Sequence, residues 1–213
     1  MISSLIISLK VLAIDVPLLL IIGVALGWIL AKTEFKGKDL LDVLVILPIA
    51  LPPSVLGLYL LMTLSHIPFI REAEVLFSFP AAALAPLFPS LPIMIQAARS
   101  GFSSVDRQLE QAARTLGDSE LKIFWRITFP LSRLSIMAGL ALASMRALGD
   151  FGVTLMIAGN IPGRTQTLPL FIYSNVEAMN FLEANIAALL LTILGIASLL
   201  IVKKLEGRHI ELS

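Results

Sequence analysis

Residues 11–31 read VLAIDVPLLLIIGVALGWILA and carry one charged side chain, Asp15. A helix needs about 20 predominantly apolar residues to cross the roughly 30 Å hydrocarbon layer of a bilayer. The long apolar stretches of this chain lack the period-two alternation of a barrel strand, and open sheet edges cannot exist in lipid. The sequence therefore predicts an all-α integral membrane protein with five spanning helices, at residues 11–31, 43–64, 75–97, 134–158 and 184–202.

The composition supports this class and excludes several others. Of the 213 residues, 57% are hydrophobic and 15% are charged, whereas a soluble domain is about 45–50% apolar and about 25% charged. The lack of cysteine excludes a disulfide scaffold, the apolar excess excludes disorder, and the net charge of +1 excludes a basic nucleic-acid-binding protein. Residues 1–4 carry no basic side chain, so the first stretch predicts a retained span rather than a signal peptide. Without internal repeats, residues 1–213 are expected to form one domain.

The positive charges predict the orientation of the chain, because Lys and Arg accumulate on the cytoplasmic side of a membrane. If the spans alternate, twelve basic residues lie on one side and three on the other. The N-terminus is thus expected outside and the C-terminus in the cytoplasm, with a long inner loop at 98–133 and a long outer loop at 159–183. The inner residues are Lys32, Lys36, Lys38, Arg99, Arg107, Arg114, Lys122, Arg126, Arg133, Lys203, Lys204 and Arg208, and the outer ones are Lys10, Arg71 and Arg164.

The inner loop has the pattern of an ordered helix. Residues 103–106 offer a hydroxyl cap followed by an acid, and Gly117 can end the helix in the left-handed conformation. A second short helix, capped by Ser119, is expected at 120–126, and Pro130 is expected at the entry to the fourth span. The first helix carries an apolar stripe, which either packs on the bundle or the membrane surface or inserts into a groove of a cytoplasmic partner. The stripe comprises Val105, Leu109, Ala112, Ala113 and Leu116.

Residues 110–117 read EQAARTLG, and after nine more residues positions 127–130 read ITFP. This arrangement resembles the EAA loop of binding-protein-dependent ABC importer permeases, with Gln111 at the position of the family's Glu and Phe129 at that of its Leu. The resemblance implies that the loop docks in a cleft of a cytoplasmic ATPase subunit. The residues that it assigns to docking are Glu110, Gln111, Ala112, Ala113, Gly117, Ile127 and Pro130.

Two later segments indicate which branch of these permeases the chain resembles. Residues 146–152 read RALGDFG and residues 159–169 read GNIPGRTQTLP. They resemble the molybdate/tungstate branch of these permeases, which usually has Glu where this chain has Asp150 and whose close relatives carry sulfate and thiosulfate. The resemblance implies a type I importer permease in the cell membrane that moves the oxyanion by ATP-driven alternating access. It also implies a homodimer of permease copies, two cytoplasmic ATPase subunits and an extracytoplasmic oxyanion-binding protein.

Two alternatives remain beside a molybdate/tungstate permease. The first is the same architecture moving sulfate or thiosulfate. The second, of another class, is a membrane protein that docks a cytoplasmic partner without transporting.

The chain lacks the residues expected of an enzyme. It contains no Gly-x-x-x-x-Gly-Lys-Ser/Thr phosphate loop, so ATP and Mg²⁺ are expected on the partner subunit, with no cofactor in this chain. The two histidines, His66 and His209, are expected on opposite sides of the membrane. No metal-ligand set or nucleophile–base pair can be assembled from this sequence.

Polar and proline residues within the predicted spans indicate the transport pathway. Arg146 and Asp150, at i and i+4, either form a pair that orients their span or one that opens when a gate moves. The prolines either curve their helices statically or bend them around a gate. Small residues at 23/27 and 139–147 permit close helix contact, within the chain or between copies. The pathway and gating candidates are Pro52, Pro53, Ser54, Arg146, Asp150 and Asn160, and the candidates for contact with a binding protein are Arg164, Thr165 and Gln166.

Overall fold

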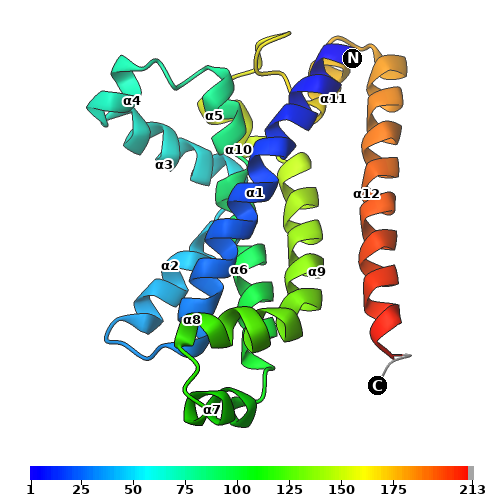
Figure 1. Ribbon diagram of the computed structural model, residues 1–213. Coiled ribbons are helices and arrows are strands. Elements are labelled where there is room, and N and C mark those ends of the chain that lie inside the picture. Colours follow the sequence, from blue (N-terminus) through cyan, green and yellow to red (C-terminus); the bar gives the residue numbers. More distant parts are fainter. Residues whose placement is uncertain (211–213) are drawn as a thin grey trace.

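The computed structural model describes residues 1–210, without the side chains of residues 201, 202 and 205–210. The predictions for Arg208 and His209 and the predicted domain end at residue 213 lie outside this description. All regular structure in the described part is helical (Figure 1). Its helices long and apolar enough to cross a membrane are Ile2–Lys32, Phe79–Ser103, Glu120–Leu148 and Phe181–Leu200.

The centre of the molecule is formed by α1 (Ile2–Lys32), α6 (Leu87–Ser103) and α9 (Phe129–Leu148). Small residues let their backbones approach closely, as in membrane helices generally. A Cβ atom added to Gly23 would lie 2.2 Å from Met94 Cγ, and one added to Gly139 would lie 2.2 Å from Ala97 Cβ. Both contacts are with α6, so the two small-residue patterns serve packing within the chain.

The predicted second span is not one straight helix. Helices α2 (Lys38–Ala50) and α3 (Pro53–Ser65) meet at an angle of 118°. Pro52 holds the chain extended, with φ −55° and ψ 138°, because a proline ring disfavours helical backbone in the residue before it and lacks an N–H. Helix α2 buries none of its residues, and it lies apart from α1 at one side of the bundle (Figure 1).

The third and fourth predicted spans are displaced along the chain. After α4 (Pro68–Glu72), helices α5 (Phe79–Leu84) and α6 extend the third span to Ser103. The fourth span begins at α8 (Glu120–Ile123), continues through a π-helical turn, η1 (Phe124–Thr128), and ends with α9. Phe129 N donates to Phe124 O across this wide turn, and Pro130 follows in the first turn of α9 without interrupting it. Pro130 therefore lies at the entry to α9, as predicted, but the short helix expected at 120–126 is continuous with the span.

The fourth span ends ten residues earlier than predicted, at Leu148 rather than 158. Gly149 ends α9, and α10 (Gly152–Ala158) starts a separate short helix that packs against α3 and α5. This arrangement encloses an apolar cluster at the end of the bundle opposite the inner loop, which includes Ile7, Val11, Ala82, Val153 and Ile157.

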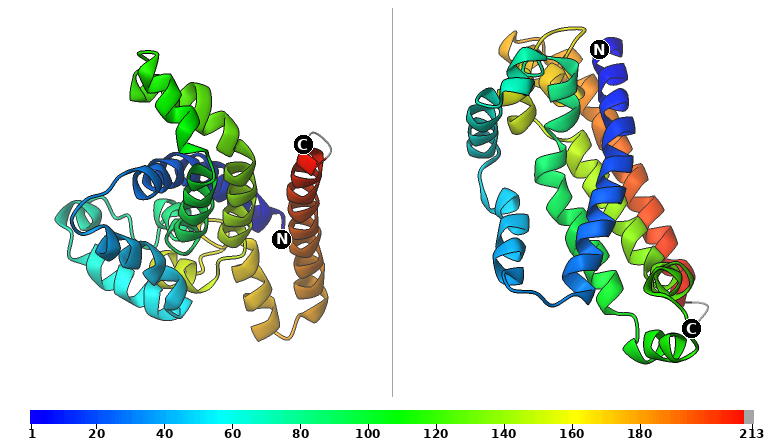
Figure 2. Two further views of the ribbon diagram at one scale, coloured as in Figure 1. Left: turned by 90° about the horizontal axis from the view of Figure 1, so that it is seen from below. Right: turned by 60° about the vertical axis from the view of Figure 1, so that its left-hand side comes forward.

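The last two helices lie at the edge of the bundle. Helix α11 (Leu168–Glu177) closes the end of the bundle near the N-terminus, and α12 (Phe181–Ile210) runs back along α9 (Figures 1 and 2). Only 11% of the most apolar window of α12 is buried, so this helix presents most of its apolar surface outward. The fold thus leaves apolar faces at both sides, α2–α3 and α12.

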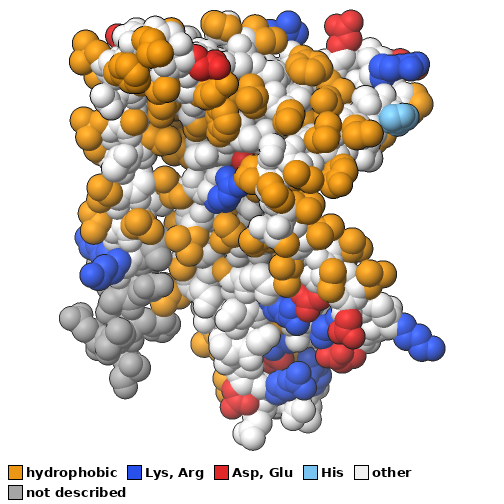
Figure 3. Space-filling view, turned by 180° about the vertical axis from the view of Figure 1, so that it is seen from behind, with side chains coloured by type: hydrophobic (Ala, Val, Ile, Leu, Met, Phe, Trp, Pro, Cys, Tyr) orange, Lys and Arg blue, Asp and Glu red, His pale blue; other side chains and the backbone are white. Residues whose placement is uncertain are grey.

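Charged side chains gather at the two ends of the molecule, most densely at the loop end (Figure 3). Figure 3 shows Lys, Arg, Asp and Glu side chains clustered around the loop end, with hydrophobic side chains over most of the middle. The same view shows the molecule hollowed between α3 and α2. The distribution matches a helical bundle whose middle lies in lipid.

Candidate functional site

The inner loop forms the helix that the sequence predicts. Helix α7 spans Arg107–Thr115. Its N-terminal cap is Asp106, whose Oδ1 accepts a hydrogen bond of 2.8 Å from Gln108 N, whereas residues 103 and 104, expected to provide the hydroxyl cap, form the end of α6. The cap is displaced because α6 continues to Ser103, six residues beyond the predicted end of the third span at 97.

Gly117 ends α7 as predicted. Its φ is +89°, in the left-handed region that favours glycine. Gly117 N donates to Arg114 O at 3.0 Å, and Asp118 N donates to Ala113 O at 3.1 Å. These two bonds constitute a Schellman motif, which satisfies the free carbonyls at the helix end.

The predicted docking residues divide between the two faces of the loop. Glu110 and Ala113 are buried, at 4% and 7% exposure, whereas Gln111 and Ala112 are exposed. The predicted apolar stripe divides as well: Val105 is buried, but Leu116 is 87% exposed. The outward face available to a partner comprises Gln108, Leu109, Gln111, Ala112, Leu116 and Gly117.

Glu110 fastens α7 to two spanning segments. Its Oε1 lies 2.9 Å from Lys32 Nζ at the end of α1 and accepts a hydrogen bond of 2.7 Å from Thr128 Oγ1 in η1. Both Glu110 and Thr128 are buried, and the Lys32 side chain is only 13% exposed. Glu110 thus ties α7 to both α1 and the turn that precedes α9. We name Lys32, Glu110 and Thr128 the loop anchor.

We expect Glu110→Gln to weaken the coupling of the loop to the bundle. Removing one partner of a buried pair costs about 3–5 kcal/mol, and the lower end applies because glutamine can still accept from Thr128 although Lys32 loses its counter-charge. Uptake by the assembled transporter should fall several-fold, and the complex should unfold at a lower temperature. Uptake assays in vesicles and thermal unfolding of the purified complex measure the two effects.

The matched control for that variant is Glu120→Gln. Glu120 forms a bidentate pair with Arg114, but both side chains are well exposed, at 61% and 44%. Exposed pairs contribute about 0–1 kcal/mol. Equal losses in both variants would contradict the role of the loop anchor.

The hydrogen bond to Glu120 raises the pKa of the Arg114 guanidinium above its usual value.

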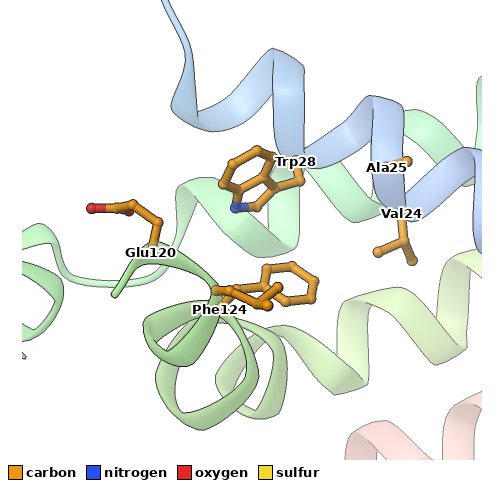
Figure 4. A pocket seen from close by; sticks show the side chains of 6 residues that line it. Val24, Ala25, Trp28, Glu120 and Phe124 are labelled. Carbon is orange, nitrogen blue, oxygen red and sulfur yellow. The ribbon is translucent and has the colours of Figure 1, made fainter. Parts of the chain in front are cut away.

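Aromatic contacts hold α8 and η1 beside α1. Trp28 of α1 and Phe124 of η1 meet edge to face, with ring centroids 6.1 Å apart. They line an apolar pocket together with Val24, Ala25 and Leu121, and Figure 4 shows Glu120 pointing away from the two rings. Ile127 is half-buried in the same turn, and Pro130 is exposed.

The intramembrane charges form an ion pair across the end of α9. Arg146 Nη1 lies 3.3 Å from Asp150 Oδ1. The other oxygen, Asp150 Oδ2, accepts from Thr154 N at 2.9 Å and from Thr154 Oγ1 at 2.8 Å. The Asp150 side chain is fully buried, while that of Arg146 is 33% exposed. The pair therefore joins α9 to α10 rather than bracing one continuous helix.

The outer loop is ordered by the beginning of α1. Ser4 Oγ donates to Gln166 Oε1 at 3.2 Å, and Leu168 N donates to Ser8 Oγ at 2.8 Å. Thr165 is 0% exposed and Gln166 is 7% exposed. Both side chains hold the loop together, and their expected contact with a binding protein stays a prediction.

The remaining outer candidates keep a polar environment. Arg164 is exposed, and Asn160 is half-buried. Asn160 Nδ2 donates to Ser174 Oγ at 2.6 Å, and its Oδ1 accepts from Gln166 Nε2 at 3.0 Å.

The other pathway candidates lie together at the bend between α2 and α3. They are Pro52, Pro53 and Ser54, and all three are exposed.

Residues that sequence reasoning missed are mainly the partners of those it found. Lys32 was assigned only as an inner charge, and Thr128 and Thr154 were not singled out. The position of Lys32 at the end of a span is visible in the sequence, but its contact with Glu110 joins residues 78 positions apart. Among the described residues, no group of three or more His, Cys, Asp or Glu side chains could hold a metal ion.

Comparison with known proteins decides the family. Residues 23–210 match the family "Binding-protein-dependent transport system inner membrane component". The chain belongs to this family. It is a permease subunit of an ABC importer in the inner membrane and not an enzyme, since ATP hydrolysis belongs to a separate subunit. Membership also implies a binding-protein partner.

Individual members of this permease family are similar over most of their length. The molybdenum transport system permease protein ModB of Escherichia coli (strain K12) is 39% identical over 182 residues, which cover 82% of this chain and 80% of ModB. The putative molybdenum transport system permease protein YvgM of Bacillus subtilis (strain 168) is 37% identical, covering 84% and 82%. The sulfate transport system permease protein CysW of Synechocystis sp. (strain ATCC 27184 / PCC 6803 / Kazusa) is 32% identical, covering 92% and 73%.

A solved permease shares the fold. A chain of the MetNI methionine ABC transporter, in an inward-facing conformation, superposes with a TM-score of 0.67. The match covers 95% of this chain and 93% of that one at 13% sequence identity. At this identity the likeness establishes the type I permease fold alone.

Proposed function

We propose that this permease moves molybdate, and the chemically similar tungstate, into the cell by ATP-driven alternating access. The observation that carries the proposal is the 39% identity to E. coli ModB over four fifths of that protein. The competing hypothesis is that the chain moves sulfate, since sulfate permeases of the family are also similar, at 32% identity for CysW. The two hypotheses differ in substrate and share the same architecture.

The proposed topology has five spans, with the bent pair α2–α3 as the second. The N-terminus lies outside and the C-terminus in the cytoplasm. Of the six ion pairs between described residues, five lie at the loop end, which is the expected concentration of charge at the cytoplasmic face. The chain is one domain, and its cytoplasmic coupling loop, predicted at 98–133, comprises residues 104–119 between α6 and α8.

The proposed coupling runs from α7 into the bundle. Its outward face, with Gln111, Ala112 and Leu116 exposed, seats in a cleft of the ATPase subunit. Its inward face is fixed by the loop anchor to α1 and η1. Because Glu110 is buried in that anchor, it positions the docking helix, while the exposed residues contact the ATPase. Closure of the ATPases would thereby move the helices around the pathway.

A second copy of the permease is proposed to cover the α2–α3 face. Helix α2 buries none of its residues, and apolar side chains such as Leu40, Val43 and Ile49 are more than half exposed. The bend at Pro52 and Pro53 places α3 and α2 around the hollow seen in Figure 3. A homodimer would enclose this hollow between two copies and make it the pathway.

The permease itself presents few fixed charges to an oxyanion. Arg146 is one-third exposed but balanced by Asp150, and Ser54 and Asn160 offer neutral polar groups. A weakly binding route lets an ion leave as well as enter. Selectivity is therefore assigned to the extracytoplasmic binding protein, of which exposed Arg164 is a proposed contact.

Transport by the reconstituted complex tests the proposal. We expect vesicles that contain the permease, its ATPase and its binding protein to accumulate labelled molybdate when ATP is supplied. Unlabelled tungstate should compete strongly and sulfate weakly. Vesicles without ATP and vesicles without binding protein are the controls. Sulfate competing better than tungstate would assign the chain to the sulfate permeases, and binding of the ATPase without any uptake would favour a docking protein.

A further inference from the structure

Asp15 is a buried acid for which the transport mechanism has no use. The first span is predicted to begin at residue 11, but α1 begins at Ile2, so Asp15 lies near the middle of this 31-residue helix. Its exposure is 0%, and neither carboxylate oxygen has a hydrogen-bond partner. An isolated carboxylate in such a place carries a large desolvation cost, which neutralisation removes.

The face of α1 that carries Asp15 packs inward. Val11 and Leu19, one turn to either side of Asp15, are buried at 3% and 0% exposure. Gly23 and Gly27 of the same face contact Met94 and Ala98 of α6. Asp15 is thus enclosed by protein and not by lipid, and water does not reach its carboxyl group.

Asp150 lines a small cavity together with Ser8 and Val11 of α1, and Val11 lies one turn from Asp15. Among the described residues of α5, α6 and α9, no basic side chain is left for Asp15: α5 carries none, Arg99 of α6 is paired with Asp42, Arg146 of α9 is paired with Asp150, and Arg133 of α9 is exposed. On α11, Tyr173 and Glu177 bond to each other at the surface, and Lys10 of α1 is exposed. Asp15 therefore has no basic partner among these residues.

The two acids differ in what satisfies them. Asp150 has Arg146 and two donors from Thr154, which are the partners of an ionised carboxylate. Asp15 has no donor at all. Protonation would make the Asp15 carboxyl group neutral and give it an O–H group that can donate a hydrogen bond. Thr167 Oγ1 is another buried oxygen without a hydrogen-bond partner. Thr167 lines the small cavity that Val11 and Asp150 also line.

We propose that Asp15 is a buried proton-binding site, in which its carboxyl group carries a proton. A sodium ion is disfavoured as the occupant, because no hydroxyl group lies within hydrogen-bonding distance of the Asp15 oxygens and hard cations require several oxygen ligands. Release of the proton would set two negative charges against each other between α1 and the α9–α10 junction. The packing of α1, and with it transport, becomes sensitive to alkaline pH.

Infrared spectroscopy of the purified complex tests protonation directly. We expect a carboxylic-acid C=O band that shifts in D₂O and is lost in Asp15→Asn. Asp15→Glu should move the band without removing it, which keeps the test valid if the Asn variant folds poorly. The matched control is Asp42→Asn, which removes an acid already paired with Arg99 and should leave the band unchanged. A wild-type spectrum without such a band, or a band that survives in Asp15→Asn, overturns the proposal.

The pH dependence of uptake and of thermal unfolding supplies a second readout. Because the folded protein binds a proton that an exposed Asp would release, its stability falls as the pH rises. Wild-type uptake should fall several-fold from neutral to alkaline pH more steeply than uptake by Asp15→Asn, which cannot ionise there. Equal pH profiles would contradict the inference, and unfolding that depends on sodium at fixed pH would assign the site to that ion instead.

Discussion

Replacing Gly117 with proline should abolish ATP-driven uptake and the stimulation of ATP hydrolysis, while the chain still inserts into the membrane. Proline fixes φ near −65°, but Gly117 has φ +89°. Proline also removes the N–H that Gly117 donates to Arg114 O. Loss of this helix end costs about 3 kcal/mol, about a hundredfold shift in the local equilibrium. Uptake and ATPase assays on the reconstituted complex, with quantification of the permease in membranes, measure the effect.

Gly117→Asn is the matched control, because asparagine adopts the left-handed conformation more readily than other side chains and keeps the N–H. No atom outside the immediate backbone lies within 4 Å of a Cβ atom built at this position, so steric conflict does not confuse the comparison. The Asn variant should retain most of the uptake. Full coupling in the proline variant would show that the Schellman end of α7 does not shape the docking surface.

The loop helix could be predicted from the sequence because the residues that determine it are close together in the chain. The limits of α7, the glycine at its end and the family pattern all lie within about 25 residues. The faces of α7 were harder to predict. Its periodicity placed Val105 and Leu116 in one stripe, yet Val105 precedes the helix and is 5% exposed, whereas Leu116 follows it and is 87% exposed.

The spans were predicted as regions and not as shapes. Hydropathy measures only whether a segment can enter lipid, and residues 43–64 and 134–158 pass that test although each contains a break. The break at Pro52 was visible as a cluster of prolines. The end of α9 at Gly149 was not visible in the sequence, because the residues after Gly149 are as apolar as those before it. These residues form a separate helix, α10, which packs against α3 and α5.

The site residues that the sequence missed depend on distant contacts. Pairs such as Lys32–Glu110 and Ser4–Gln166 are 78 and 162 residues apart. No periodicity within either segment encodes them. The burial of Thr165 and Gln166 belongs to the same class, since a polar, glycine-containing loop ordinarily lies at the surface.

Asp150→Ala should produce the second large loss, in both the amount of stable complex and its transport. The substitution leaves Arg146 within the membrane without its partner and leaves Thr154 N without its side-chain acceptor. Removing one partner of a buried pair costs about 3–5 kcal/mol, and the lower end applies because Arg146 is one-third exposed. Because the pair joins α9 to α10, the loss should appear as a lower unfolding temperature of the complex and as uptake reduced at least tenfold.

Two further variants separate the charge of Asp150 from its hydrogen bonds. Asp150→Glu keeps the charge and should retain much of the activity, whereas Asp150→Asn keeps an acceptor for Thr154 but strands the positive charge of Arg146. Combining Arg146→Met with Asp150→Ala removes both charges, so the double variant should be more stable than the sum of the single losses predicts. Additive losses, or wild-type uptake in Asp150→Ala, would exclude the pair from the mechanism. Stability restored in the double variant without uptake would instead show that Arg146 itself is required along the pathway.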